Sequence, residues 1–209
     1  MQNSFPYIDI LIFGIIAVFL IFRLKNILGT KTGFEKSNIN EKTHEKQFTN
    51  IVSLKSKKND LNDKELIEIM KVDPNFNIND FLSGSKNFFK MVLESFVSGN
   101  LESIKNFTKP SVLKSFKTAI DERNSEHETL IIDLKSIKEN KITKATITKS
   151  SIKLNVIFET SQIRALLDKN DKIIDGNSES EILVKDEWVF ERKLHDNNPN
   201  WTLVETKSS

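Results

Sequence analysis

The order of hydrophobic and polar positions divides the chain into three regions that predict different structures. The first region is an apolar run over residues 5–22 that contains one charge, Asp9, and ends at Arg23. Its length of about 18 residues just suffices to cross a hydrocarbon core about 30 Å thick. We therefore predict a transmembrane anchor at residues 1–28, in which the most informative positions are Phe5, Tyr7, Ile10, Phe13, Phe19, Phe22, Arg23 and Lys25.

A cleaved secretory signal and a buried helix of a soluble domain are the alternatives to this anchor. A secretory signal begins with basic residues and ends in small ones, whereas residues 1–9 hold no Lys or Arg and Arg23 follows the apolar core. The run also lacks the polar stripe of a helix at the surface of a soluble domain. Because basic flanks stay in the cytoplasm, the pattern predicts a single-pass inner-membrane protein whose N-terminus faces out and whose C-terminal domain is cytoplasmic.

The second region, residues 29–62, is predominantly polar and predicts a flexible tether, since it buries too little apolar surface to offset its ordering entropy. It carries one basic cluster next to apolar residues, which could lie on anionic lipid. An ordinary solvated linker is the alternative interpretation. The basic cluster is Lys55, Lys57 and Lys58, and the apolar residues just before it are Ile51, Val52 and Leu54.

In the third region, residues 63–209, apolar positions first recur with helical spacing. Asn62 and Glu65 resemble a capping box that opens a short helix, which Pro74 cannot continue. The strongest pattern predicts a helix from Asp80 to Ser98 with Gly99 as its left-handed C-cap. Its apolar positions are Phe81, Leu82, Phe88, Phe89, Val92, Leu93 and Phe96.

Two further helices and a set of strands follow. A short helix is expected around residues 101–107, and another begins with Thr108 as N-cap and Pro110 in the first turn. After Glu128 the period changes to two, which predicts antiparallel strands. The predicted strands are Thr129–Ile137, Ile142–Lys149, an alternation over 152–158, a longer one through Ile182, Val184, Trp188, Phe190 and Leu194, and, after a turn at 197–199, Trp201–Thr206. Helices followed by strands predict an α+β domain with helices on one face of a curved sheet.

Composition excludes several classes of function. The chain has no Cys, so it has no disulfide framework, no thiolate nucleophile and no thiolate metal site. Its three histidines, His44, His127 and His195, share no ligand-like spacing. A net charge of +2 does not by itself indicate nucleic-acid binding. We therefore expect no metal, no cofactor and no direct nucleic-acid ligand.

Short blocks of residues resemble one known family. At the N-terminus, Tyr7-Ile8-Asp9-Ile10 runs into Phe22-Arg23-Leu24, with Leu28-Gly29 and Thr32-Gly33 behind it. Five blocks lie further along the chain: Asp73–Phe76, Phe81–Lys86, Ala119–Arg123, Trp188–Arg192 and Pro199–Thr206. In order and spacing they resemble bacterial TimA proteins, relatives of the mitochondrial inner-membrane import-motor scaffold of the Tim-forty-four family. The resemblance covers the predicted anchor and the chain from Asp73 onward, and skips the tether.

The resemblance implies a nuclear-transport-factor-two-like cone, in which a bent antiparallel sheet wraps around helices and leaves an apolar cavity. It also implies a membrane-tethered scaffold whose partners are the lipid bilayer and membrane- or ribosome-associated proteins, in membrane-protein biogenesis, protein translocation or complex assembly. The mitochondrial scaffold has a long, charged helical region that recruits the import chaperone. Here an anchor and a short polar tether stand in its place, so the chaperone-recruiting role does not carry over.

The cone fold also hosts isomerase-like enzymes, which use a carboxylate base and an oxyanion hole that includes a Tyr. The one Tyr, Tyr7, lies in the predicted anchor. Asp186 and Arg192 share the strand face of Trp188 and Phe190, where a polar pair is either catalytic or an ion pair at a sheet end. We predict no catalytic residues. A cone-fold enzyme of isomerase type, or a lipid or acyl-chain binding protein, stays open as the alternative.

Aromatic content favours binding by shape. The chain has 15 Phe among 209 residues, and a cone that does not close leaves some rings beside a cavity suited to an acyl chain or an apolar peptide. Most of these residues must be core. The candidate cavity residues are Phe88, Phe89, Val92, Phe96, Phe158, Trp188 and Phe190.

Overall fold

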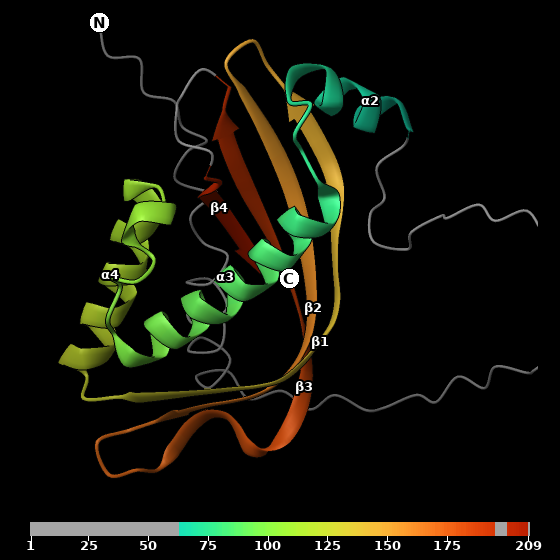
Figure 1. Cartoon of the computed structure of the whole chain (residues 1–209). Coiled ribbons are helices and arrows are strands. Elements are labelled where there is room, and N and C mark those ends of the chain that lie inside the picture. Colours follow the sequence, from blue (N-terminus) through green and yellow to red (C-terminus); the bar gives the residue numbers. More distant parts are fainter. Residues whose placement is uncertain (1–62, 195–199, 209) are drawn as a thin grey trace, which may run out of the picture.

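The computed structural model describes residues 63–194 and 200–208 and is an α+β domain (Figure 1). The helices precede the strands along the chain, as predicted. They are α2 (Asp63–Val72), α3 (Ile78–Ser98), the 3-10 helix η1 (Lys105–Phe107) and α4 (Pro110–Ser125), followed by β1 (Thr129–Ile147), β2 (Ser151–Leu167), β3 (Ile173–Lys193) and β4 (Thr202–Ser208). The predicted anchor and tether, the capping residue Asn62, His44, His195 and the turn at 197–199 lie outside the described residues.

The four strands form one antiparallel sheet in the order β1-β2-β3-β4, so each strand pairs with its neighbour in sequence. The sheet is strongly curved, and α3 crosses its concave side while α4 lies beside α3 (Figure 1). Among residues 63–194 and 200–208, no helix is both long and apolar enough to cross a membrane.

β1 differs from the prediction, which placed separate strands at Thr129–Ile137 and Ile142–Lys149. The strand is continuous from Thr129 to Ile147, because shifts in register after Leu134, Ile137 and Ile142 keep its polar middle paired with β2. Asn140 explains why this polar stretch stays in the sheet. Its side-chain amide donates to the carbonyl oxygen of Leu82 in α3 at 2.9 Å, so the residue joins the two layers.

The predicted inner face of β3 is only partly right. Val184, Trp188 and Phe190 are buried, but Ile182 is 43% exposed. The reason is the register shift opposite Ile182, where residues 178–181 of β3 have no partner in β2. β3 therefore bulges away from its neighbour at the end where the alternation predicted a buried side chain.

The helix ends predicted at Gly99 and Pro110 agree with the structure, and the one predicted at Thr108 does not. Asn77 caps α3 by accepting from the amides of Asn79 and Asp80, and Gly99 is its left-handed C-cap at φ 76°. Pro110 stands in the first turn of α4, as predicted. Thr108 is not the N-cap, because its extended backbone forms a parallel bridge with Leu203 of β4 and Lys109 takes the cap position.

The core lies between α3 and the concave side of the sheet. Phe89 of α3 stacks on Phe158 of β2 with ring centroids 4.5 Å apart, and it lies 4.7 Å from Trp188 of β3. All three rings are fully buried. Arg123 fastens α4 to this layer, since its Nη2 donates to the carbonyl oxygens of Phe96 and Val97, each at 3.1 Å, near the C-terminal end of α3. A cation suits that end of a helix.

Candidate binding pocket

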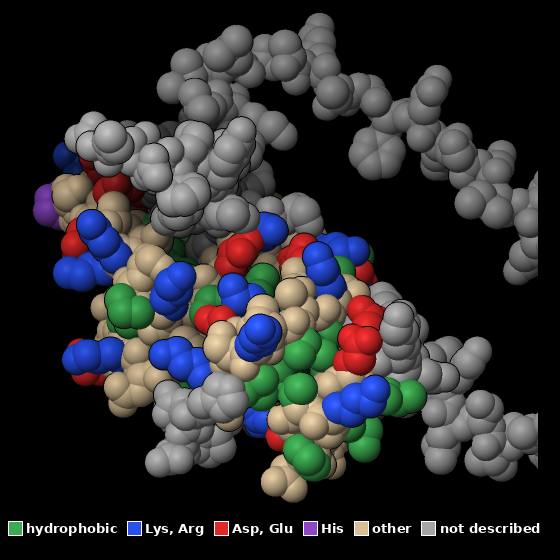
Figure 2. All heavy atoms as spheres, turned by 90° about the horizontal axis from the view of Figure 1, so that it is seen from above, with side chains coloured by type: hydrophobic (Ala, Val, Ile, Leu, Met, Phe, Trp, Pro, Cys, Tyr) green, Lys and Arg blue, Asp and Glu red, His purple; other side chains and the backbone are tan. Residues whose placement is uncertain are grey.

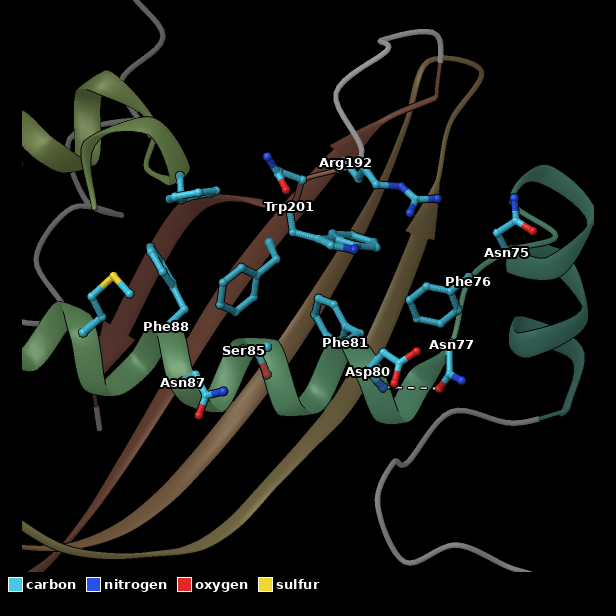
Figure 3. A pocket seen from close by; sticks show the side chains of 15 residues that line it. Asn75, Phe76, Asn77, Asp80, Phe81, Ser85, Asn87, Phe88, Arg192 and Trp201 are labelled. Atoms are coloured by element: carbon cyan, nitrogen blue, oxygen red, sulfur yellow. Dashed lines mark hydrogen bonds between the residues drawn. The ribbon is translucent and has the colours of Figure 1, made fainter. Parts of the chain in front are cut away.

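An open pocket of about 450 Å³ lies between the first half of α3, the α2–α3 connection and the ends of β3 and β4 that meet there (Figure 3). Its size is in the range of small-ligand sites. Most of its lining is aromatic or apolar, contributed by Phe76, Phe81, Phe88, Met91, Phe107, Phe190 and Trp201. Apart from Gly84, the remaining lining residues are polar.

Trp201 is the centre of the aromatic lining. Its ring lies 4.8 Å from that of Phe81 and 5.9 Å from that of Phe76, both in edge-on arrangements. Figure 3 shows Phe81 and Phe88 extending from α3 toward the side of the pocket where Trp201 lies, just before β4. Edge-on contacts between rings are favourable, so the rings hold one another in place and the pocket keeps its shape without a ligand.

An ion pair fixes one end of the pocket. Asp73, just after α2, pairs with Arg192 at the end of β3, and their side chains are only 10% and 17% exposed. The Arg192 guanidinium also lies 5.3 Å above the Trp201 ring, a cation–π contact. Burial lowers the pKa of Arg192 from its usual value. Arg192 is the cation of the lining, and its charge is already matched by Asp73.

The rim is made of side-chain amides and one carboxylate. The amides belong to Asn75, Asn77, Asn87 and Asn200, all exposed. An amide offers both a donor and an acceptor. Asp80 supplies the carboxylate, and it forms no ion pair with another residue of the described ranges. The rim therefore has a negative charge that no cation of the described residues pairs with.

Gly84 leaves a gap in the helical wall of the pocket. It lies inside α3 and lines the pocket, and a Cβ added to it would meet no atom within 4 Å. Glycine in a helix interior costs about 1 kcal/mol relative to alanine. Packing within the domain does not explain this glycine, because the space beside it is open.

The predicted cavity residues separate into two groups. Phe88 and Phe190 line the pocket. Phe89, Val92, Phe96, Phe158 and Trp188 are buried in the core and do not line it. Sequence reasoning missed Phe76, Phe107, Trp201 and Gly84. The signal for Phe76 and Trp201 was present, since both belong to blocks that carry the family resemblance, and the signal for Gly84 was a glycine in the middle of a strong helical pattern.

Asp186 and Arg192 do not form the polar pair considered from the sequence. They lie six residues apart on β3, which is about 20 Å along a strand. Arg192 pairs with Asp73 instead. Asp186 is buried and interacts with Arg164 of β2. Burial lowers the pKa of Arg164, and the nearby charge of Asp186 offsets part of this effect. In residues 63–194 and 200–208, no cluster of three or more His, Asp or Glu could hold a metal ion.

The blocks that carry the family resemblance meet at this pocket. Asp73–Phe76, Phe81–Lys86, Trp188–Arg192 and Pro199–Thr206 each contribute to its lining or to the ion pair behind it. The fifth block, Ala119–Arg123, holds the arginine that fastens α4 to α3. Segments more than 100 residues apart in the sequence thus build one site.

Comparison with known proteins identifies a family and a set of similar solved structures. The sequence model of the Tim44-like domain matches residues 63–208. A search of curated proteins finds no match. Among solved structures, the crystal structure of the intermembrane space region of the chloroplast protein ARC6 is similar, with a TM-score of 0.42 and 12% sequence identity, over 61% of this chain and 95% of that chain.

Proposed function

Because this chain belongs to the Tim44-like domain family, we propose that it is a membrane-anchored, non-catalytic binding module that holds another protein at the inner face of the inner membrane. Residues 63–209 are the binding domain, which we interpret as a nuclear-transport-factor-two-like cone. Residues 29–62 are the tether, and residues 1–28 are the anchor. The bound proteins are membrane- or ribosome-associated.

The observation that carries this proposal is the aromatic pocket. It is preformed, mostly apolar and rimmed by amides, which are the features of a recognition site. Two lining residues, Met91 and Phe107, are 38% and 36% exposed although they are large and apolar. Exposed apolar surface around a pocket indicates an interaction site.

Binding fits the polar groups of the pocket better than catalysis. The hydroxyl in the lining belongs to Ser85, and it donates to the carbonyl oxygen of Leu82 at 3.0 Å. A nucleophilic serine needs a base within hydrogen-bond reach, and in the described part of the chain the Ser85 hydroxyl is hydrogen-bonded to Leu82 and to the Asn140 amide, neither of which is a base. The rim amides can bind and orient a peptide, but they do not ionise near neutral pH and so do not act as a general acid or base.

Photocrosslinking from the rim tests the proposed binding. With benzoylphenylalanine at Asn87 of the full chain in native membranes, we expect discrete crosslinks to one or a few proteins. Met91→Lys should reduce these crosslinks at least fivefold, because it places a charge in the apolar lining at an exposed position that the fold tolerates. Ser83→Lys, on an exposed part of the same helix outside the pocket, should leave them unchanged.

Equal crosslinking in Met91→Lys and Ser83→Lys, or crosslinks to lipid alone, would contradict a protein-binding pocket. The isomerase alternative has its own readout. A folded Asp186→Asn variant that keeps every crosslinked partner yet loses cellular function would favour an enzyme over a scaffold.

Protease accessibility tests the proposed anchor and its orientation. In a chain tagged at its C-terminus, added protease should remove the domain from inverted inner-membrane vesicles and leave it intact in right-side-out ones, since basic residues follow the apolar run. A soluble mature product that lacks residues 1–22 would contradict the anchor. Digestion in right-side-out preparations would contradict its orientation.

A further inference from the structure

From the gap at Gly84 we infer that the pocket receives a bulky apolar side chain of a partner polypeptide, which packs on the α3 backbone at Gly84 and is followed by a basic residue that faces Asp80. This inference rests on the proposed binding function and names the chemistry of the bound segment. It also makes Gly84 a specificity-determining residue of the site.

Helical geometry places Gly84 at the middle of the wall. Positions three and four residues apart lie on one face of a helix, so Gly84 shares its face with Phe81 and Phe88, whose rings line the pocket on either side. The absent side chain therefore leaves a slot between two rings. A bulky group that enters this slot reaches helix backbone below and ring edges at both sides.

An occupant from outside the domain explains why position 84, at the base of the slot, is a glycine. A glycine is needed inside a fold where a neighbour approaches closely or where φ is positive. Neither condition holds at Gly84, since no atom lies within 4 Å of the added Cβ and α3 is regular from Ile78 to Ser98. Gly176 shows the contrast, because its φ is 75° and a Cβ there would lie 2.3 Å from the carbonyl oxygen of Arg164.

Charge distinguishes a polypeptide from an anionic lipid as the occupant. Among the described residues, the charged groups of the lining are Asp80 and Arg192, and Arg192 is matched by Asp73. A carboxylate or phosphate headgroup would face Asp80 with no cation of the lining left to pair with. Asp80 lies four residues before Gly84, about 6 Å along the helix axis, so the long side chain of a Lys or Arg next to the bulky residue can reach it. The rim amides can pair with the peptide groups on either side.

The test uses the full chain in nanodiscs and a defined probe, N-acetyl-5-fluorotryptophanyl-lysinamide, observed by its ¹⁹F line width. We expect saturable broadening beyond that with empty nanodiscs. Gly84→Met should weaken binding at least tenfold by filling the slot, whereas Ser83→Met, on the exposed side of the same helix, should change it less than twofold. The matching glutamate dipeptide and hexanoate should displace the probe at least tenfold less well than the unlabelled lysine dipeptide.

Thermal melting shows that the loss does not come from unfolding. Gly84→Ala should raise the melting temperature by about 2–4 °C, because it removes a helix glycine without a clash. It should also weaken binding of the probe at least threefold.

Undiminished binding of the probe by Gly84→Met would overturn the role of Gly84, and displacement by hexanoate or the glutamate dipeptide would overturn the charge argument. If the wild-type chain does not bind the probe but still gives crosslinks from Asn87, the inferred chemistry of the occupant is wrong and the proposed binding function stands. Loss of those crosslinks as well would overturn both.

Discussion

Trp188→Ala should lower the free energy of unfolding by about 3–5 kcal/mol, the usual cost of truncating a large buried aromatic side chain. Trp188 is fully buried, and its ring contacts those of Phe89, Phe158 and Phe190 at centroid distances of 4.7, 5.4 and 6.3 Å. Its removal leaves a cavity where α3 meets the sheet. Chemical denaturation of the full chain, followed by circular dichroism, measures the loss.

Leu183→Ala is the matched control for this substitution. Leu183 lies on the same strand but is 80% exposed, so its truncation should change stability by no more than about 0.5 kcal/mol. Phe96→Ala should resemble Trp188→Ala, because Phe96 is 9% exposed and lies under the Arg123 guanidinium. Similar small effects at Trp188 and Leu183 would mean that the assigned inner face of β3 is wrong.

Removal of either partner of the Asp73–Arg192 pair should cost about 3 kcal/mol, because it leaves the other charge buried without a counterion. The change should also loosen the α2–α3 connection, and with it the position of Phe76 in the pocket lining. We expect Arg192→Met and Asp73→Asn to weaken probe binding as well as stability. Denaturation curves and the probe titration measure the two effects separately.

A double-mutant cycle isolates the interaction between these two charges. The double variant, with Asp73→Asn and Arg192→Met together, should be more stable than the sum of the single losses predicts, since neither charge is then left alone. The surface pair Lys117–Asp121, 70% and 58% exposed, is the control, and its cycle should give no more than about 0.5 kcal/mol. Additive losses at Asp73 and Arg192 would show that the pair contributes nothing as a pair.

The parts of the fold that sequence predicted best are those in which one physical signal dominates. The apolar positions of α3 recur at helical spacing from Phe81 to Phe96, and the alternation at Ile152, Leu154, Val156 and Phe158 matches four fully buried side chains. β1 was divided wrongly because a bulge lets a polar stretch keep its pairing, and the tie from Asn140 to Leu82 joins residues 58 positions apart. Local periodicity does not contain that contact.

The pocket was harder to predict than the core, although both are built from aromatic residues. Periodicity identifies the inner face of an element, but it does not show where the covering layer ends and a cavity begins. Phe89 and Phe88 are neighbours in sequence, yet one is fully buried and the other borders the pocket. Phe76 and Trp201 lie outside the regular elements. Their ring contact depends on how the α2–α3 connection and the residue before β4 approach each other in space.

The sheet has two open edges, and each is protected from pairing with another copy of the chain. An unprotected edge strand offers free amides and carbonyls to a second sheet, which leads to aggregation. On β1, the exposed side chains of Lys138 and Lys144 place like charges along the edge, and Lys135 forms an ion pair with Asp133 there. On β4, the bridge of Thr108 with Leu203, reinforced by the Lys109 amide that donates to Leu203 at 2.8 Å, occupies backbone groups at that edge. Crowding of many copies should therefore not drive them into fibrils through their sheet edges.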